Sequence, residues 1–123
     1  MSRGASATEP PASQESFDSD LVWRALGDPN RRHILDLLRE RPHTTNELCE
    51  HFDSTRFAVM KHLKVLAAAS LILIERRGRH RYNHINPLPI QQIYRRWIRP
   101  FEALASDRLL KIKRLAEARK ETR

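Results

Sequence analysis

Apolar residues recur along the chain with the spacing of short helices, separated by proline, glycine and helix-capping residues. The pattern predicts a first helix over 20–26, ended by Gly27. A second helix is expected to begin after Asp28, with Pro29 in its first turn and Pro42 beyond its end. Its predicted buried face consists of Ile34, Leu35, Leu37 and Leu38.

Two further helices are predicted in close succession. Thr44 and Glu47 have the spacing of a capping box, which indicates a helix over 45–52. Asp53-Ser54 is expected to cap the next helix, which runs to about Ala69. Its predicted packed side consists of Val59, His62, Leu63, Val65 and Leu66.

The remainder of the pattern predicts a hairpin followed by a long helix. The segments 71–77 and 80–85 favour strands, and Gly78-Arg79 lies between them as a turn. Apolar residues at helical spacing then continue from 90 to about 118, with Pro100 kinking or interrupting the helix. The expected fold is mainly α, with element order α-α-α-α-β-β-α.

Three segments of different composition are expected along the chain. Residues 1–18 are rich in Ser, Ala, Pro and Glu and are predicted to be a disordered tail. Residues 19–106 are predicted to be the folded domain. Residues 107–123 form a basic helical extension, whose charges we interpret as solvated rather than as a contact to a polyanion.

The composition narrows the choice of partners. There are 23 Lys and Arg residues against 15 Asp and Glu, giving a net charge of +8. An excess of this size indicates a polyanionic partner, because basic side chains release counterions when they bind phosphates.

The single cysteine excludes an intramolecular disulfide framework. No apolar leader segment or bilayer-length apolar stretch is apparent, so we expect a cytoplasmic protein without membrane contact.

The third and fourth predicted helices form a helix-turn-helix, whose second helix would be presented to the DNA major groove. Its first turns carry the residues expected to contact DNA. Arg56 is the candidate for bidentate contact to guanine and Phe57 for contact to a thymine methyl. The other candidates are Ser54, Thr55, Lys61 and Lys64. The alternative interpretation of this face is an ordinary solvated helix surface.

The predicted hairpin makes the DNA interpretation more specific. It carries four arginines around its glycine turn, namely Arg76, Arg77, Arg79 and Arg81. Such close guanidinium groups repel one another unless an anion neutralises them. A basic wing lying on the phosphates or entering the minor groove would supply that anion.

These motifs resemble the ArsR/SmtB family of winged helix-turn-helix repressors. The resemblance runs from about Leu21 to Leu109 and is carried by the segments 26–35, 59–66 and 76–79. It implies a homodimer that binds an imperfect palindrome and represses its own operon. By analogy, the DNA contacts would fall on Thr55, Arg56 and Lys61 of the helix, and on Arg77, Arg79 and Arg81 of the wing.

The sequence argues against the metal sensing for which this family is known. Thiolate sensors carry two cysteines one residue apart, whereas this chain has Cys49 followed by His51. One thiolate and one imidazole leave a tetrahedral site two ligands short. No histidine follows residue 86, so the site on the last helix is missing as well. We expect no metal or cofactor, and we interpret Cys49 as a packed apolar group and His62 as a structural hydrogen-bonding residue.

The last predicted helix carries an aromatic-rich apolar stripe, which is typical of a dimer interface. Packing against the same chain is the alternative. The candidate interface residues, including three from the first helix, are Leu21, Trp23, Leu26, Tyr94, Trp97, Ile98, Phe101 and Leu104.

The sequence therefore favours a homodimeric DNA-binding regulator, most simply a repressor acting at a palindromic operator through helix 54–69 and wing 71–86. Two alternatives stay open: a metal- or redox-released sensor of the same family, and a winged-helix protein-interaction module that does not bind DNA. An enzyme is not expected, because the chain has three glycines, no phosphate loop and no nucleophile–base arrangement. A small-molecule effector is not identified from the sequence.

Overall fold

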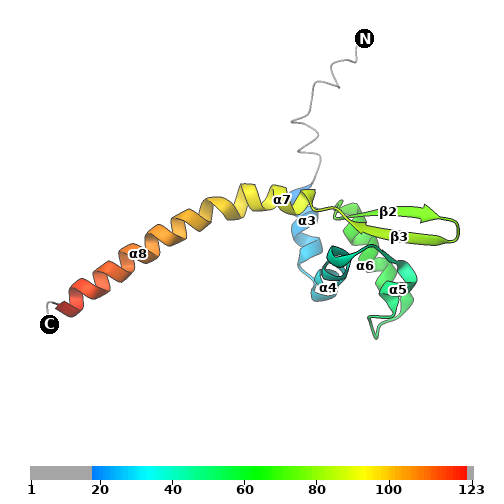
Figure 1. Ribbon diagram of the computed structural model, residues 1–123, viewed down its shortest axis with the longest axis horizontal. Helices are drawn as coiled ribbons and strands as arrows, with labels where there is room; N and C mark the ends of the chain where they lie inside the picture. The colour runs from blue at the N-terminus through cyan, green and yellow to red at the C-terminus, as the bar shows by residue number, and fades with distance from the viewer. Residues whose placement is uncertain (1–17, 122–123) are drawn as a thin grey trace, which may run out of the picture. The chain divides into compact units, whose positions relative to one another are not determined.

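The computed structural model describes residues 18–121, so the predicted tail lies outside the described residues except for Asp18. The chain divides into two compact units, one ending at Ile90 and the other beginning at Gln91. Within residues 18–90, the first unit contains four complete helices and a small sheet (Figure 1).

The helices of the first unit are α3 (Ser19–Leu26), α4 (Pro29–Glu40), α5 (Thr45–Cys49) and α6 (Arg56–Ala68). The predicted caps of α4 and α5 are confirmed. The Asp28 carboxylate accepts the Arg31 N–H at 3.1 Å. Thr44 and Glu47 bond to each other's backbone N–H groups, completing the capping box.

The predicted C-terminal end of α5 and the predicted start of α6 were wrong. α5 ends at Cys49 rather than Phe52, and α6 is capped by Thr55 rather than by Asp53-Ser54. The Thr55 hydroxyl accepts the Ala58 N–H at 3.1 Å, which is the bond from the cap to the third helical position. Ser54 and Asp53 therefore belong to the turn that precedes the cap.

The core lies where α3, α4 and α6 contact one another and where α6 contacts both α5 and the sheet. Its fully buried side chains come from these elements, since the apolar face of each helix needs a neighbouring element to cover it. They include Val22, Ile34, Leu38, Leu48, Val59, Leu66 and Ile72. On the opposite side of α6, Arg56, Lys61 and Lys64 are exposed, as predicted.

A Schellman-type turn leads directly from α6 into the hairpin. Ser70 has a left-handed backbone (φ 61°), and the Leu71 N–H donates to the Leu66 carbonyl at 3.0 Å. β2 (Ile72–Arg77) and β3 (His80–Ile85) follow, joined at Gly78 with φ 58°. The base of the hairpin is closed by Asn86, whose amide donates to the Ser70 carbonyl at 2.8 Å.

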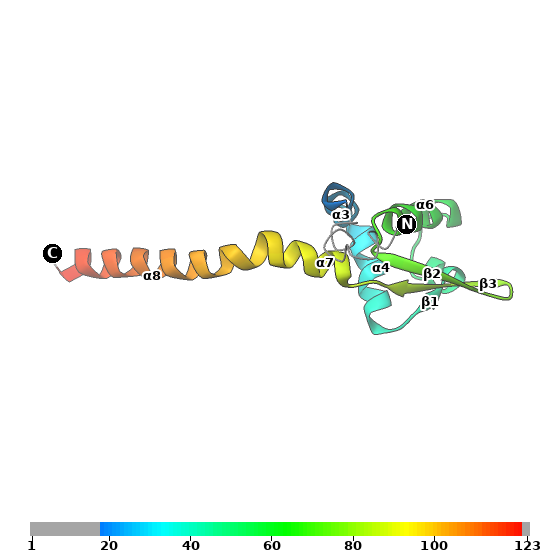
Figure 2. The same ribbon diagram turned by 90° about the horizontal axis from the view of Figure 1, so that it is seen from above.

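The sheet has a third strand that the sequence did not predict. β1 (His43–Thr44) pairs antiparallel with β3, so that the strand order is β1-β3-β2 (Figure 2). His43 lies opposite Asn83, and Thr44 lies opposite Tyr82. Two residues are too few for an alternating pattern, which is why this strand was missed.

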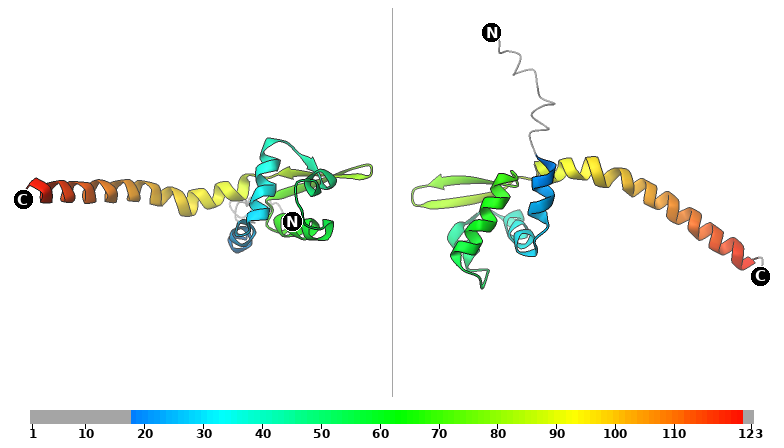
Figure 3. Two further views of the ribbon diagram at one scale, coloured as in Figure 1. Left: turned by 90° about the horizontal axis from the view of Figure 1, so that it is seen from below. Right: turned by 180° about the vertical axis from the view of Figure 1, so that it is seen from behind.

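The second unit is helical throughout its described residues. α7 (Leu88–Ile93), a π-helical turn η1 (Tyr94–Ile98) and α8 (Arg99–Glu121) form one helical run without a break (Figure 3). Pro100 lacks an N–H and would clash with the carbonyl four residues earlier. The wider π turn, in which the Arg99 N–H donates to the Tyr94 carbonyl, accommodates this proline inside the helix.

Candidate nucleic-acid interface

The exposed side of α6 carries a strip formed by Phe57, Lys61 and Lys64, whose spacing places them on one helical face. Phe57 is 72% exposed, so its ring is available for contact. The Lys61 ammonium lies 5.7 Å from the centre of the Phe57 ring. This strip offers apolar contact and positive charge side by side.

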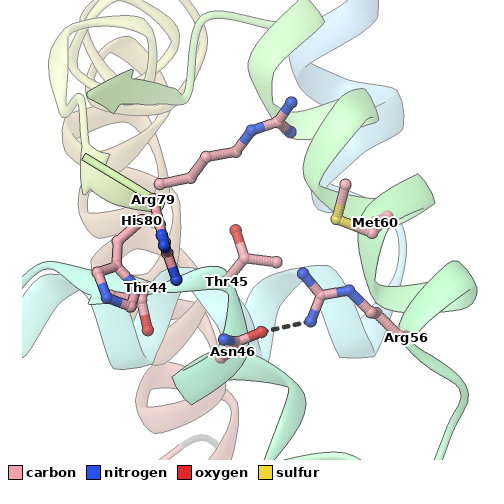
Figure 4. A pocket seen from close by; sticks show the side chains of 8 residues that line it. Thr44, Thr45, Asn46, Arg56, Met60, Arg79 and His80 are labelled. Atoms are coloured by element: carbon pink, nitrogen blue, oxygen red, sulfur yellow. Dashed lines mark hydrogen bonds between the residues drawn. The ribbon is translucent and has the colours of Figure 1, made fainter. Parts of the chain in front are cut away.

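Three other predicted DNA-contacting residues lie at the start of α6 or just before it. Ser54 is exposed in the preceding turn. Thr55 uses an oxygen lone pair for capping, which leaves its hydroxyl hydrogen able to donate. Arg56 donates from Nη1 to Oδ1 of Asn46 on α5 (Figure 4). Because guanidinium carries five N–H donors, this bond orients Arg56 without exhausting its donors.

Three of the four hairpin arginines lie on the two faces of the ribbon, and Arg79 lies in the turn between the strands. Arg76 lies directly opposite Arg81 in the β2–β3 register, on the face that also carries Ile74 and the buried Asn83. Arg77 lies on the other face with Glu75 and Tyr82. Like charges directly opposite each other destabilise a sheet, so the Arg76–Arg81 pair is electrostatically unfavourable in the isolated chain.

The prediction that all four arginines need an external anion was wrong for Arg77. Its guanidinium donates to Glu75 Oε1 at 3.0 Å and lies 4.5 Å from the centre of the Tyr82 ring. Nε2 of His84 lies 2.9 Å from the same carboxylate oxygen. The hydrogen bonds from Arg77 and His84 hold the pKa of Glu75 below its ordinary value. Glu75 thus neutralises Arg77 within the chain.

The remaining hairpin arginines have no acidic partner among residues 18–121. Arg79 and Arg81 line a pocket together with Arg56 from the first turn of α6 (Figure 4). The pocket has a volume of about 270 Å³, and its other walls include Thr45, Asn46 and His80. The fold therefore brings predicted helix and wing residues to one basic site.

Two residues of this region were missed from the sequence. Asn46 orients Arg56, and no local pattern indicates a contact between residues ten positions apart. Glu75 could have been found, because it is the one acidic residue between 70 and 86 and residues two apart in a strand share a face. The alternation alone would have paired it with Arg77.

The structural role predicted for His62 is supported by its contacts. Its Nδ1 lies 3.4 Å from Arg31 Nη1 and 3.9 Å from Asp28 Oδ2. Burial raises the pKa of Asp28, but the Arg31 backbone N–H and the charges of His62 and Arg31 outweigh that effect, so the net shift is downward. Within the described range, no three His, Cys, Asp or Glu side chains are grouped to hold a metal ion.

The predicted dimer residues of α3 differ in exposure. Trp23 is 43% exposed, whereas Leu21 and Leu26 are half-buried. In the second unit all five predicted residues are exposed, from 39% at Tyr94 to 55% at Phe101. The Tyr94 hydroxyl donates to Glu102 at 2.8 Å, and this hydrogen bond raises the pKa of Tyr94.

Within residues 18–121, no helix is long and apolar enough to cross a bilayer.

Comparisons with known proteins agree with this geometry. Residues 26–75 match the family model described as a helix-turn-helix domain. The chain is 36% identical over 70 residues to the transcriptional repressor SdpR of Bacillus subtilis (strain 168), covering 57% of this chain and 78% of SdpR. It is 38% identical over 88 residues to the HTH-type transcriptional regulator YuzN of the same strain, covering 66% of this chain and 96% of YuzN.

Solved structures also point to a family of transcriptional regulators. The crystal structure of the ArsR family transcriptional regulator RHA00566 has a TM-score of 0.64 and 30% identity, with 71% of this chain and 89% of that chain covered. An ArsR-like transcriptional regulator from Rhodococcus sp. RHA1 has a TM-score of 0.65 and 27% identity, with 80% and 90% covered. The chain belongs to the ArsR family.

As an ArsR-family protein it is a transcriptional regulator that binds DNA through a winged helix-turn-helix, so the predicted family and fold class are confirmed. The residues that contact DNA in this ArsR-family chain, and its state of assembly, stay predictions.

Proposed function

We propose that the protein is a homodimeric repressor that binds a palindromic operator, with α6 in the major groove and the β2–β3 hairpin on the adjacent backbone. The observation that carries this proposal is the convergence of Arg56, Arg79 and Arg81 beside the exposed Phe57–Lys61–Lys64 strip. A surface that combines apolar contact with unneutralised guanidinium groups fits base edges flanked by phosphates.

Each residue of the surface has a distinct proposed role. Arg56, held by Asn46, reads a guanine edge, and Phe57 packs on a thymine methyl. Ser54, Thr55 and Lys64 bind phosphates, and Lys61 reaches either a base or a phosphate. In the hairpin, phosphate or minor-groove contact is proposed for Arg76, Arg77, Arg79 and Arg81, with Arg77 contributing least because Glu75 already neutralises it.

Repression is supported by the relative SdpR, which is named a transcriptional repressor. A bound dimer that covers promoter DNA excludes polymerase sterically and needs no catalytic step. Two reading helices related by a two-fold axis would meet major grooves about 34 Å apart, so the operator is expected to be palindromic.

Dimerisation is supported by the apolar stripe of the second unit. Trp97, Ile98, Phe101 and Leu104 are 43–55% exposed, and Ile112 and Leu115 continue the stripe at 61% and 71%. Helical spacing places these residues on one side of the run. Exposed aromatic and aliphatic side chains at this density are typical of a helix that packs against a second copy. Leu21, Trp23 and Leu26 of α3 are proposed to join the interface.

DNA binding is tested by fluorescence anisotropy with the chain's own upstream intergenic DNA and a scrambled duplex of equal length, at two salt concentrations. The proposal expects preference for the native duplex and a steep loss of affinity with salt, about 0.9 in log–log slope for each phosphate contacted. Equal, weak binding to both duplexes and to a selected random library would contradict it.

Dimerisation is tested by sedimentation of Phe101→Glu and of a matched control, Leu110→Glu. Nine residues separate the two positions, about two and a half helical turns, so they lie on opposite sides of α8. Phe101→Glu is expected to sediment as a monomer with weakened operator binding, and Leu110→Glu as a dimer. If both variants stay dimeric, the interface lies elsewhere.

A further inference from the structure

A second cavity of the first unit lies between α6 and the inner face of the hairpin, the face that carries Ile74, Arg76, Arg81 and Asn83. Its volume is about 690 Å³, within the range of small-molecule sites. Its walls are largely apolar and include Phe57, Ala67 and Ile74. We call this cavity the α6–wing groove.

A buried amide on β3 forms part of the groove lining. Asn83 is 1% exposed, and its Nδ2 donates to the His43 carbonyl at 3.2 Å and to the Thr45 hydroxyl at 3.3 Å. Its Oδ1 is buried and has no hydrogen-bond donor among residues 18–121. A buried acceptor without a donor is destabilising, so a ligand that donates to Oδ1 would relieve this penalty on binding.

Three cations lie on the rim of the groove. Lys61 and Lys64 come from α6 and Arg81 from β3, and none of them has an acidic partner within residues 18–121. Their charge would attract an anionic group placed at the mouth. DNA phosphates would not satisfy Asn83 Oδ1, because a phosphodiester offers only acceptors.

We propose that the α6–wing groove binds a small amphipathic organic anion: an aromatic carboxylic acid with a hydrogen-bond donor at the end opposite the carboxylate. The donor bonds Asn83 Oδ1, the ring lies between Phe57 and Ile74, and the carboxylate meets Lys61, Lys64 and Arg81. The ligand and an operator would then use the same lysines and the same phenylalanine. Ligand binding would therefore release DNA, a consequence that rests on the proposed function, whereas binding itself does not.

The binding step is tested without DNA, by a protein-observed NMR titration of the full chain. The probes are para-hydroxybenzoate, para-hydroxyphenylacetate and para-hydroxyphenylpropionate. We expect at least one to bind and to shift the Asn83 side-chain amide and the amides of α6 and β3. Its para-methoxy analogue, which lacks the donor, is expected to bind about tenfold more weakly, as is its carboxamide, which lacks the charge.

Two variants on one strand localise the binding. Ile74→Trp fills the groove, whereas Leu73→Trp adds the same bulk on the opposite face of β2, where Leu73 is 56% exposed. Thermal melts confirm that both variants fold. Ile74→Trp is expected to lose probe binding and Leu73→Trp to retain it. Absence of binding by every probe, or equal binding by both variants, would overturn the proposal.

The effect on DNA is measured separately, by anisotropy competition with the operator duplex and with each variant's own affinity as its reference. The probe is expected to release DNA from the unmodified chain and from Leu73→Trp, but not from Ile74→Trp. Failure to bind any duplex would count against the proposed function alone, because the NMR titration still tests the groove. Probe binding that leaves the operator complex intact would overturn the competitive part of the proposal.

Discussion

The two faces of the β2–β3 hairpin carry arginines of the same type in opposite electrostatic environments. On the outer face, Arg77 is bonded to Glu75 at 3.0 Å and stacks on Tyr82. On the inner face, Arg76 and Arg81 lie directly opposite each other without an acidic partner within residues 18–121. An arginine count therefore overstates the charge available to DNA, and the face on which each arginine lies determines its use.

The largest expected effect comes from removing charge on the inner face. Arg81→Ala should weaken operator binding by about tenfold or more and reduce the salt slope by about 0.9, because an unneutralised phosphate contact is lost. Arg77→Ala is the matched control on the outer face and should lose less, because Glu75 already neutralises Arg77 within the chain. Anisotropy titrations at several salt concentrations measure both. Equal losses would show that the two faces do not differ in function.

The turn that joins β2 to β3 is expected to be sensitive to substitutions that disfavour its left-handed backbone conformation. Gly78 has φ 58°, and an added Cβ would meet nothing within 4 Å. Gly78→Ala should therefore cost about 1–2 kcal/mol through backbone strain alone, with DNA binding weakened as the wing frays. Gly78→Asn should cost less, because asparagine tolerates this conformation. Chemical denaturation compares the two, and equal stability of all three proteins would contradict the strain.

A smaller effect on operator affinity is expected from removing the carboxylate that neutralises Arg77 on the outer face. Glu75→Gln removes the negative charge beside Arg77 and leaves an amide oxygen that still accepts a hydrogen bond. Operator affinity should rise by about two- to fivefold at low salt, and the gain should disappear at high salt because screening removes it. The double variant with Arg77→Ala is the control and should show no gain. An unchanged affinity in the single variant would mean that Arg77 stays away from the phosphates.

The smallest expected effect is on the pH dependence of stability. The pKa of Glu75 is lowered from its ordinary value of 4.5 by hydrogen bonds from Arg77 and His84. A lowered folded-state pKa contributes stability that is present above the unfolded value and is lost as the pH falls through the folded one. Below about pH 4.5 the unmodified chain should lose stability faster than Glu75→Gln. Thermal melts between neutral and acidic pH measure this, and parallel curves would contradict it.

Much of the first unit could be predicted because the sequence signals of its helices and turns are local. The caps at Asp28 and Thr44 and the Gly78 turn act over a few residues, and all three were predicted correctly. The start of α6 was placed one or two residues early, because Asp53, Ser54 and Thr55 are all capping types. Only the hydrogen bond that the Ala58 N–H donates to the Thr55 hydroxyl identifies Thr55 as the cap.

By itself, the sequence determined the order of the helices, the basic hairpin and the family, because periodicity, capping and turn chemistry depend on neighbouring residues. The tertiary structure decided which charges remain available. The pairing of β1 with β3, the bond between Arg56 and Asn46, and the burial of Asn83 beneath the α6–wing groove join residues 10 to 40 positions apart. Such contacts follow from how the elements pack together, and no local pattern encodes them.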